Sequence, residues 1–85
     1  MTNKKVTIYS TPTCHYCHAA KEFFKEHNVV FEEHNVATDA ARRKEMMDKS
    51  GQLGVPVIAV SDEGGGNESI VVGFDEQHLG KLLGV

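Results

Sequence analysis

"TPTCHYCHAAK", residues 11–21, carries both cysteines of this 85-residue chain, three positions apart and each followed by a histidine. The segment before it, "VTIY" at residues 6–9, is a short run of β-type residues that stops at a turn-prone stretch. From Cys14 to about His27, apolar residues recur at helical spacing with charged residues between them. The sequence therefore predicts a strand, a turn and a helix, with both thiols in the first turn of the helix.

Outward from this stretch, the pattern predicts a β-α-β unit followed by a β-β-α unit. The expected elements are strands at 29–36, 56–60 and 69–73, a helix capped by Thr38 or Asp39 that ends near Ser50-Gly51, and a last helix at 75–83. A helix between two strands favours a parallel pair, and two strands joined by a glycine-rich connection favour an antiparallel hairpin. In the last helix we expect Asp75 as the N-cap and an apolar stripe of Leu79, Leu82 and Leu83.

Composition excludes several classes of protein. A net charge of −3 gives no reason to expect nucleic acid or an anionic membrane as a partner, and 18 apolar residues nowhere run together. The first ten residues, "MTNKKVTIYS", lack the long apolar core of a secretion signal. We therefore expect a cytoplasmic protein of one small domain. Two cysteines are fewer than a disulfide-stabilised secreted domain normally carries, so a catalytic or metal-binding role is favoured over a structural one.

The spacing of the two cysteines has its own chemical consequence. Residues three apart on a helix share one face, close enough for a disulfide to form with little backbone movement. Cys14 lies at the helix start, where unpaired N–H groups and the positive end of the dipole stabilise a thiolate. Cys17 lies one turn further in and is the expected resolving thiol, less exposed than Cys14.

Three blocks of sequence carry a resemblance to a known family. They are "CHYC" at 14–17, "GVP" at 54–56 and "VGFD" at 72–75. In order and spacing they are similar to the C-P-Y-C, T-V-P and G-G-x-D blocks of the glutaredoxins. The resemblance covers nearly the whole chain and implies an α/β, thioredoxin-like fold in a single domain, residues 1–85. In that fold a four-stranded mixed sheet, in the order 2-1-3-4, is flanked by three helices.

The resemblance also implies a thiol-disulfide oxidoreductase. Cys14 would attack a protein disulfide or a glutathione mixed disulfide, and Cys17 or glutathione would resolve the product. Glutathione would be a co-substrate, with no metal and no tightly bound cofactor. The implied partners are glutathione and disulfide-containing or glutathionylated proteins, and we expect a monomer.

Around the cysteines, the resemblance implies a substrate site for glutathione or a disulfide substrate. Its residues would be Thr13, His15, Tyr16, Gln52, Val55, Pro56, Gly73, Phe74 and Asp75. In the family the T-V-P proline is cis and the residue before it, here Val55, offers its backbone to substrate. Gly73 and Asp75 match the block that holds the γ-glutamyl end of glutathione. His15 replaces the usual proline, and two interpretations stay open: it stabilises the Cys14 thiolate, or it is an exposed residue in a variable position.

Departures from the family pattern leave two alternatives open. Thr11 and Gln52 stand where glutaredoxins often have cations that bind the glycyl carboxylate of glutathione, and Gly54 and Val72 replace the first residues of two blocks. The first alternative is a redoxin reduced by thioredoxin reductase and serving ribonucleotide reductase, a class that also has a Gly-Phe pair near the final helix.

The second alternative is a binding module for a metal. Cys14 and Cys17 with a histidine such as His18 would hold zinc or copper(I), or Cys14 would help bridge an iron–sulfur cluster between two chains. A structural zinc site normally needs a second pair of ligands, and the sequence has no second C-x-x-C and no H-x₃₋₅-H.

Overall fold

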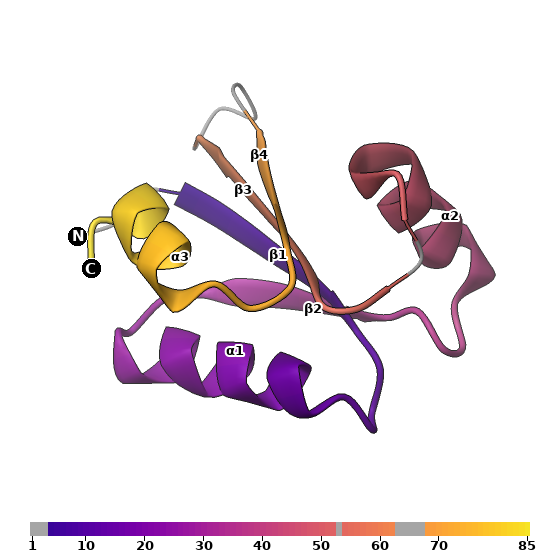
Figure 1. The fold of residues 1–85 in the computed structure, drawn as a ribbon, viewed down its shortest axis with the longest axis horizontal. Helices are drawn as coiled ribbons and strands as arrows, with labels where there is room; N and C mark the ends of the chain where they lie inside the picture. The colour runs from indigo at the N-terminus through magenta and orange to yellow at the C-terminus, as the bar shows by residue number, and fades with distance from the viewer. Residues whose placement is uncertain (1–3, 53, 63–67) are drawn as a thin grey trace.

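The computed structural model describes residues 4–52, 54–62 and 68–85, and it arranges them around one four-stranded sheet (Figure 1). In chain order the elements are β1 (Lys4–Ser10), α1 (His15–Glu26), β2 (Phe31–Asn35), α2 (Ala40–Ser50), β3 (Val57–Asp62), β4 (Ser69–Val72) and α3 (Glu76–Leu83). This is the predicted β-α-β unit followed by β-β-α. Most of the connection between β3 and β4, for which the sequence suggests no role, lies outside the described residues.

The sheet has the order β2-β1-β3-β4, as the resemblance implied. Strands β1 and β2 run parallel, with Val6 opposite Phe31. Strand β3 runs antiparallel to both β1 and β4, and Ile58 lies opposite Ile8 in the centre of the sheet. The mixed sheet places the C-terminal end of β1, and therefore the start of α1, next to the residues that lead into β3.

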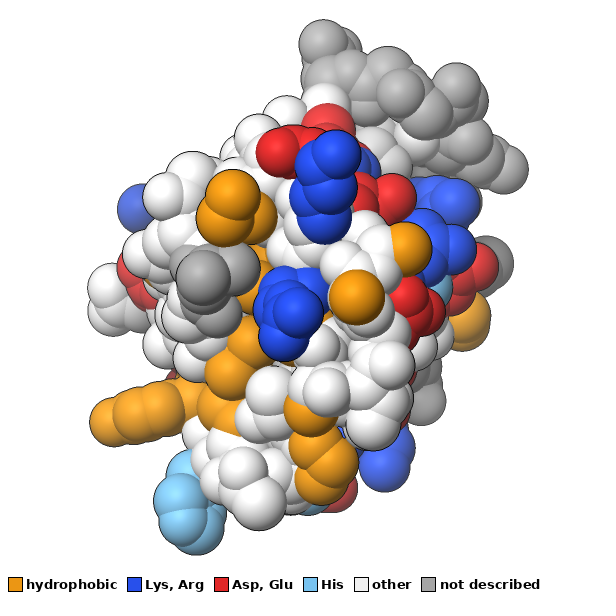
Figure 2. All heavy atoms as spheres, turned by 90° about the vertical axis from the view of Figure 1, so that its right-hand side faces the viewer, with side chains coloured by type: hydrophobic (Ala, Val, Ile, Leu, Met, Phe, Trp, Pro, Cys, Tyr) orange, Lys and Arg blue, Asp and Glu red, His pale blue; other side chains and the backbone are white. Residues whose placement is uncertain are grey.

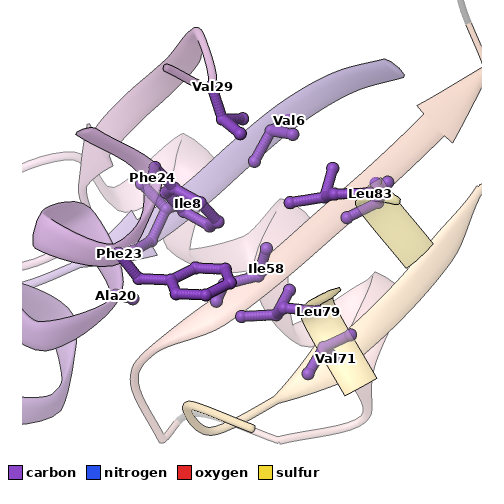
Figure 3. Packing of buried hydrophobic residues seen from close by; sticks show 11 residues of the cluster. Val6, Ile8, Ala20, Phe23, Phe24, Val29, Ile58, Val71, Leu79 and Leu83 are labelled. Atoms are coloured by element: carbon purple, nitrogen blue, oxygen red, sulfur yellow. The ribbon is translucent and has the colours of Figure 1, made fainter. Parts of the chain in front are cut away.

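Two hydrophobic layers cover the two faces of the sheet. Helices α1 and α3 pack on one face, and α2 packs on the other (Figure 1). In the larger layer, Phe23 of α1 and Leu79 of α3 converge near Ile58 of β3 (Figure 3). Met46 of α2 and Tyr9 of β1 belong to the smaller layer. Because successive strand residues point to opposite faces, β1 supplies Ile8 to one layer and Tyr9 to the other.

The second strand is shorter than the predicted 29–36. Asn28 has a φ of 57°, a left-handed conformation that ends α1. The Val29 N–H then donates to the Phe24 carbonyl at 2.8 Å. Val29 is buried against the helix as a result, whereas Val30 is 87% exposed, and β2 begins only at Phe31. The sequence predicts a strand from Val29 onward, but Val29 closes the helix and the strand begins two residues later.

The caps of the two later helices explain where they begin and end. Of the two candidates for the cap of α2, the structure selects Asp39, whose carboxylate accepts a hydrogen bond from the Arg42 N–H at 3.1 Å. Gly51 ends α2 with a φ of 75°, which favours glycine. Asp75 caps α3 as predicted, accepting from the His78 N–H at 3.1 Å. Among the described residues, no helix combines the length and hydropathy needed to cross a membrane.

The end of the molecule at which α1 begins and α2 lies has a mixed surface. Figure 2 shows basic and acidic side chains interspersed there, with hydrophobic side chains exposed between and below them. Tyr16 at the start of α1 and Val72 at the end of β4 are among the large hydrophobic residues with the most exposed side chains, at 67% and 50%. Neither sign of charge dominates the face in view, in keeping with the small net charge of the chain.

Candidate active site

Cys14 is the N-cap of α1 and lies one position before the helix begins. The sequence predicted it in the first turn of the helix. Its backbone is extended, with φ −85° and ψ 113°. Its Sγ accepts a hydrogen bond from the Cys17 N–H at 3.1 Å, as a serine or aspartate does at other helix starts. The Cys14 N–H donates in turn to the Thr11 carbonyl at 3.3 Å, which fixes the turn before the helix. A partly exposed sulfur at this position meets both an N–H donor and the positive end of the helix dipole.

Cys17 has the opposite environment. Its side chain is completely buried, and both cysteines are free thiols in this structure. Burial, together with a hydrogen bond to the Cys14 sulfur, raises the pKa of Cys17 to about 12. A backbone hydrogen bond with Thr11 and the charge of Lys21 act against this rise. The pair is therefore asymmetric, with an accessible sulfur at the helix N-terminus and a buried thiol that keeps its proton at neutral pH.

The second and third sequence blocks meet through one backbone hydrogen bond. The Gly73 N–H donates to the Pro56 carbonyl at 2.9 Å. The Val55-Pro56 peptide bond is cis, as the resemblance implied, and Gly73 has a φ of 80°. Pro56 is buried, whereas Val55 is partly buried and packs against the smaller hydrophobic layer. The start of β3 and the end of β4 are thus held together.

Phe74 and Asp75 follow Gly73 directly, and each has a different structural role. The Phe74 ring packs edge-to-face on Phe23, with 5.9 Å between the ring centroids, so its side chain contributes to the layer beneath α1 and α3. Asp75 is exposed while one of its carboxylate oxygens caps α3. The substrate-binding roles of both residues stay predictions.

The remaining predicted residues lie on the surface. Thr13, His15 and Tyr16 are exposed in the turn before α1 and in its first two positions. Gln52 is exposed just beyond α2, where the Ser50 hydroxyl accepts a hydrogen bond from its N–H at 3.2 Å. Both interpretations of His15 remain open, and the four residues keep their predicted roles as expectations.

A group of polar residues beside Cys17 was missed by the sequence reasoning. The Lys21 ammonium lies 2.7 Å from a carboxylate oxygen of Glu33 on β2, and the Ser10 hydroxyl donates to the same oxygen at 2.8 Å. Hydrogen bonds from Lys21 and Ser10 hold the pKa of Glu33 below its usual range, against the effect of its burial. The one local signal was the four-residue spacing from Cys17 to Lys21, which places both on one side of a helix.

Within 4–52, 54–62 and 68–85, no three side chains of the types His, Cys, Asp and Glu are grouped so that they could hold a metal ion. The His18 ring, the ligand considered beside the two cysteines, has its Nε2 at 3.1 Å from the Pro12 carbonyl oxygen.

The amino-acid sequence is similar to those of several known proteins. The family model named Glutaredoxin matches residues 6–64. An uncharacterised glutaredoxin-like 8.6 kDa protein in the rubredoxin operon of Clostridium pasteurianum is 45% identical over 78 residues, covering 92% of this chain and 96% of that protein. Glutaredoxin 3 of Escherichia coli strain K12 is 36% identical over 75 residues, covering 88% of this chain and 74% of that protein.

One similar solved structure is that of a redoxin. The glutaredoxin-like protein NrdH-redoxin from Escherichia coli, described as having a thioredoxin-like activity profile, superposes with a TM-score of 0.74 at 26% identity. The match covers 92% of this chain and 93% of that one.

Proposed function

The chain belongs to the glutaredoxin family and is a thioredoxin-fold redox protein with a Cys-x-x-Cys pair, and from this premise we propose a specific activity for it. The protein reduces protein disulfides and glutathione mixed disulfides, with glutathione as its electron donor. The observation that carries the proposal is the asymmetry of the pair: Cys14 is accessible and caps α1, whereas Cys17 is buried one turn away.

The first step is attack by Cys14 on the substrate disulfide. The Cys14 thiolate forms a bond to one substrate sulfur, the substrate S–S bond breaks, and the other sulfur leaves as a thiolate that takes a proton from water. The Cys17 N–H, 3.1 Å from Cys14 Sγ, stabilises the negative sulfur before attack and when Cys14 later acts as leaving group.

The second step has two routes. In the dithiol route Cys17 loses its proton and attacks Cys14 Sγ, which forms the Cys14–Cys17 disulfide and releases the reduced substrate. In the monothiol route a glutathione thiolate attacks the sulfur of the glutathione held on Cys14, which regenerates Cys14 and forms oxidised glutathione. Because burial raises the pKa of Cys17, little of its thiolate is present at neutral pH, which favours the monothiol route for glutathione mixed disulfides.

We assign substrate binding to the surface formed by the second and third blocks. The hydrogen bond between Gly73 and Pro56 supports this assignment because it holds the two blocks side by side. Val55 would pair with the backbone of the substrate, and Asp75 would bind the amine of glutathione with the carboxylate oxygen not used for capping α3. This chemistry requires the reduced thiols that glutathione maintains in the cytoplasm, which we propose as the location of the protein.

Two substitutions favour a second candidate, a redoxin that receives electrons from thioredoxin reductase. Thr11 is partly exposed and Gln52 exposed, and neither supplies the cation that many glutaredoxins have at that position. Losing a charged hydrogen bond to a carboxylate typically costs about 1.5–3 kcal/mol of binding free energy. The likeness to NrdH-redoxin supports the same candidate.

Turnover of a glutathionylated peptide tests the proposal against this candidate. Wild type, Cys17→Ser and the control Cys14→Ser would be assayed with glutathione and its reductase, and in parallel with thioredoxin reductase. We expect activity with glutathione in wild type and Cys17→Ser, and none in Cys14→Ser. Activity of wild type with thioredoxin reductase alone would contradict the proposal and favour the redoxin.

A further inference from the structure

Lys21 lies one helical turn after the buried thiol and is held by an ion pair. It lies four residues after Cys17 on α1, so both residues project from one side of the helix. Its ammonium pairs with Glu33 of β2 at 2.7 Å, and its side chain is only 19% exposed. The Ser10 hydroxyl, buried at the end of β1, donates to the same Glu33 oxygen at 2.8 Å. The lysine is therefore paired with a carboxylate that a second strand also holds.

This cluster lines a pocket with the turn that precedes α1. Ser10, His18, Lys21 and Glu33 line a pocket of about 330 Å³, together with Thr11. The backbone of Thr11 hydrogen-bonds with Cys17, and Lys21 acts on the same thiol by its charge. The side chains that influence Cys17 are Cys14 at the helix cap and Lys21 beyond it, while Lys21 and His18 both act on Glu33.

We propose that Lys21 is a positioning residue for the resolving step, in which its ammonium stabilises the Cys17 thiolate as that thiolate forms. This inference rests on the dithiol route of the proposed function. In that step the proton of Cys17 passes to solvent and its thiolate attacks Cys14 Sγ. The Cys14–Cys17 bond forms and the bond from Cys14 to the substrate sulfur breaks. The two cysteines are oxidised, and the substrate sulfur leaves as a thiolate and takes a proton from water.

The chain offers a matched control for the effect of charge. Lys25 lies one turn further along α1 and pairs with Glu22 at 3.9 Å, with 64% of its side chain exposed. Removal of its charge alters the same helix without altering the surroundings of Cys17. The arginine variant of Lys21 keeps the positive charge and serves as the conservative replacement.

The test measures closure of the Cys14–Cys17 disulfide from the mixed disulfide. Reduced protein is mixed with a glutathionylated peptide, quenched with acid at set times and analysed by mass spectrometry between pH 6 and pH 9. At pH 7 we expect closure in Lys21→Met to be about three- to tenfold slower than in wild type, with its pH profile displaced to higher pH. Lys21→Arg and Lys25→Met should stay within about twofold of wild type.

The outcomes separate this inference from the function on which it rests. Equal closure rates and pH profiles in wild type and Lys21→Met would overturn the inference alone, as would closure in Lys21→Arg as slow as in Lys21→Met. A wild type that accumulates the mixed disulfide without closing it would overturn the dithiol route and the inference together. Circular dichroism checks that each variant folds, and Lys21→Gln replaces Lys21→Met if the latter does not.

Discussion

Raising the pH should destabilise the reduced protein through Cys17. Its side chain is completely buried, and burial raises its pKa from 9.0 to about 12. Above pH 9 the thiol of the unfolded chain loses its proton while the folded protein keeps it, so the unfolded state gains stability. The contribution of this thiol is therefore fully present below about pH 9 and is lost as the pH rises toward 12.

The size of the effect follows from the pKa difference. Each pH unit between the two pKa values corresponds to about 1.4 kcal/mol. At pH 10, one unit above the pKa of 9.0 in the unfolded chain, the loss should be between about 1 and 2 kcal/mol, and at pH 11 about twice as large.

Urea unfolding of wild type and Cys17→Ala at pH 7 and pH 10, with a phosphine reductant, measures this loss. Groups that do not interact with Cys17, among them Tyr9, whose pKa is also raised by its burial, act alike in both proteins and cancel in the comparison. Wild type should be the more stable protein at pH 7, because Cys17→Ala leaves a small cavity. The difference in unfolding free energy should narrow by between about 1 and 2 kcal/mol at pH 10. A difference that stays constant from pH 7 to pH 10 would refute the reasoning.

Three further predictions concern caps and conformation. Asp75→Ala should lower the unfolding free energy by about 1 kcal/mol and Asp75→Asn by much less. Both should raise the KM for glutathione, and an unchanged KM in both would argue against the carboxylate as a ligand. Cys14→Ala should be less stable in urea than Cys14→Ser by about 1 kcal/mol, because serine keeps an acceptor for the Cys17 N–H; coincident unfolding curves would contradict the capping role. The added Cβ of Gly51→Ala meets no neighbouring atom, but the alanine must adopt a φ of 75°. Thermal unfolding should therefore show that the unfolding free energy falls by about 1–2 kcal/mol. An unchanged Tm would contradict this expected backbone strain.

The fold could be predicted because its local patterns agree with one another. The strand before Cys14, the helical spacing after it and the cap at Asp75 each depend on neighbouring residues alone. The start of β2 could not be predicted because Val29 and Val30 have the same β propensity. Only packing decides that Val29 lies against α1 while Val30 is exposed.

For the site, the sequence could predict which thiol is exposed but not what surrounds the buried one. The asymmetry of Cys14 and Cys17 follows from their order at a helix start. The position of Cys14 as cap rather than first-turn residue depends on one backbone angle, which residue types do not specify. The cluster of Lys21 with Glu33 and Ser10 joins three elements, so no local pattern could reveal it.

Trapping of the first covalent intermediate tests the central claim most directly. Cys17→Ser and Cys14→Ser would each be mixed with a glutathionylated peptide at pH 7, quenched and measured as intact proteins by mass spectrometry. The account predicts that Cys17→Ser rapidly gains one glutathione, located on Cys14, while Cys14→Ser with its buried Cys17 reacts far more slowly. Equal rates in the two variants, or faster modification of Cys17, would contradict it.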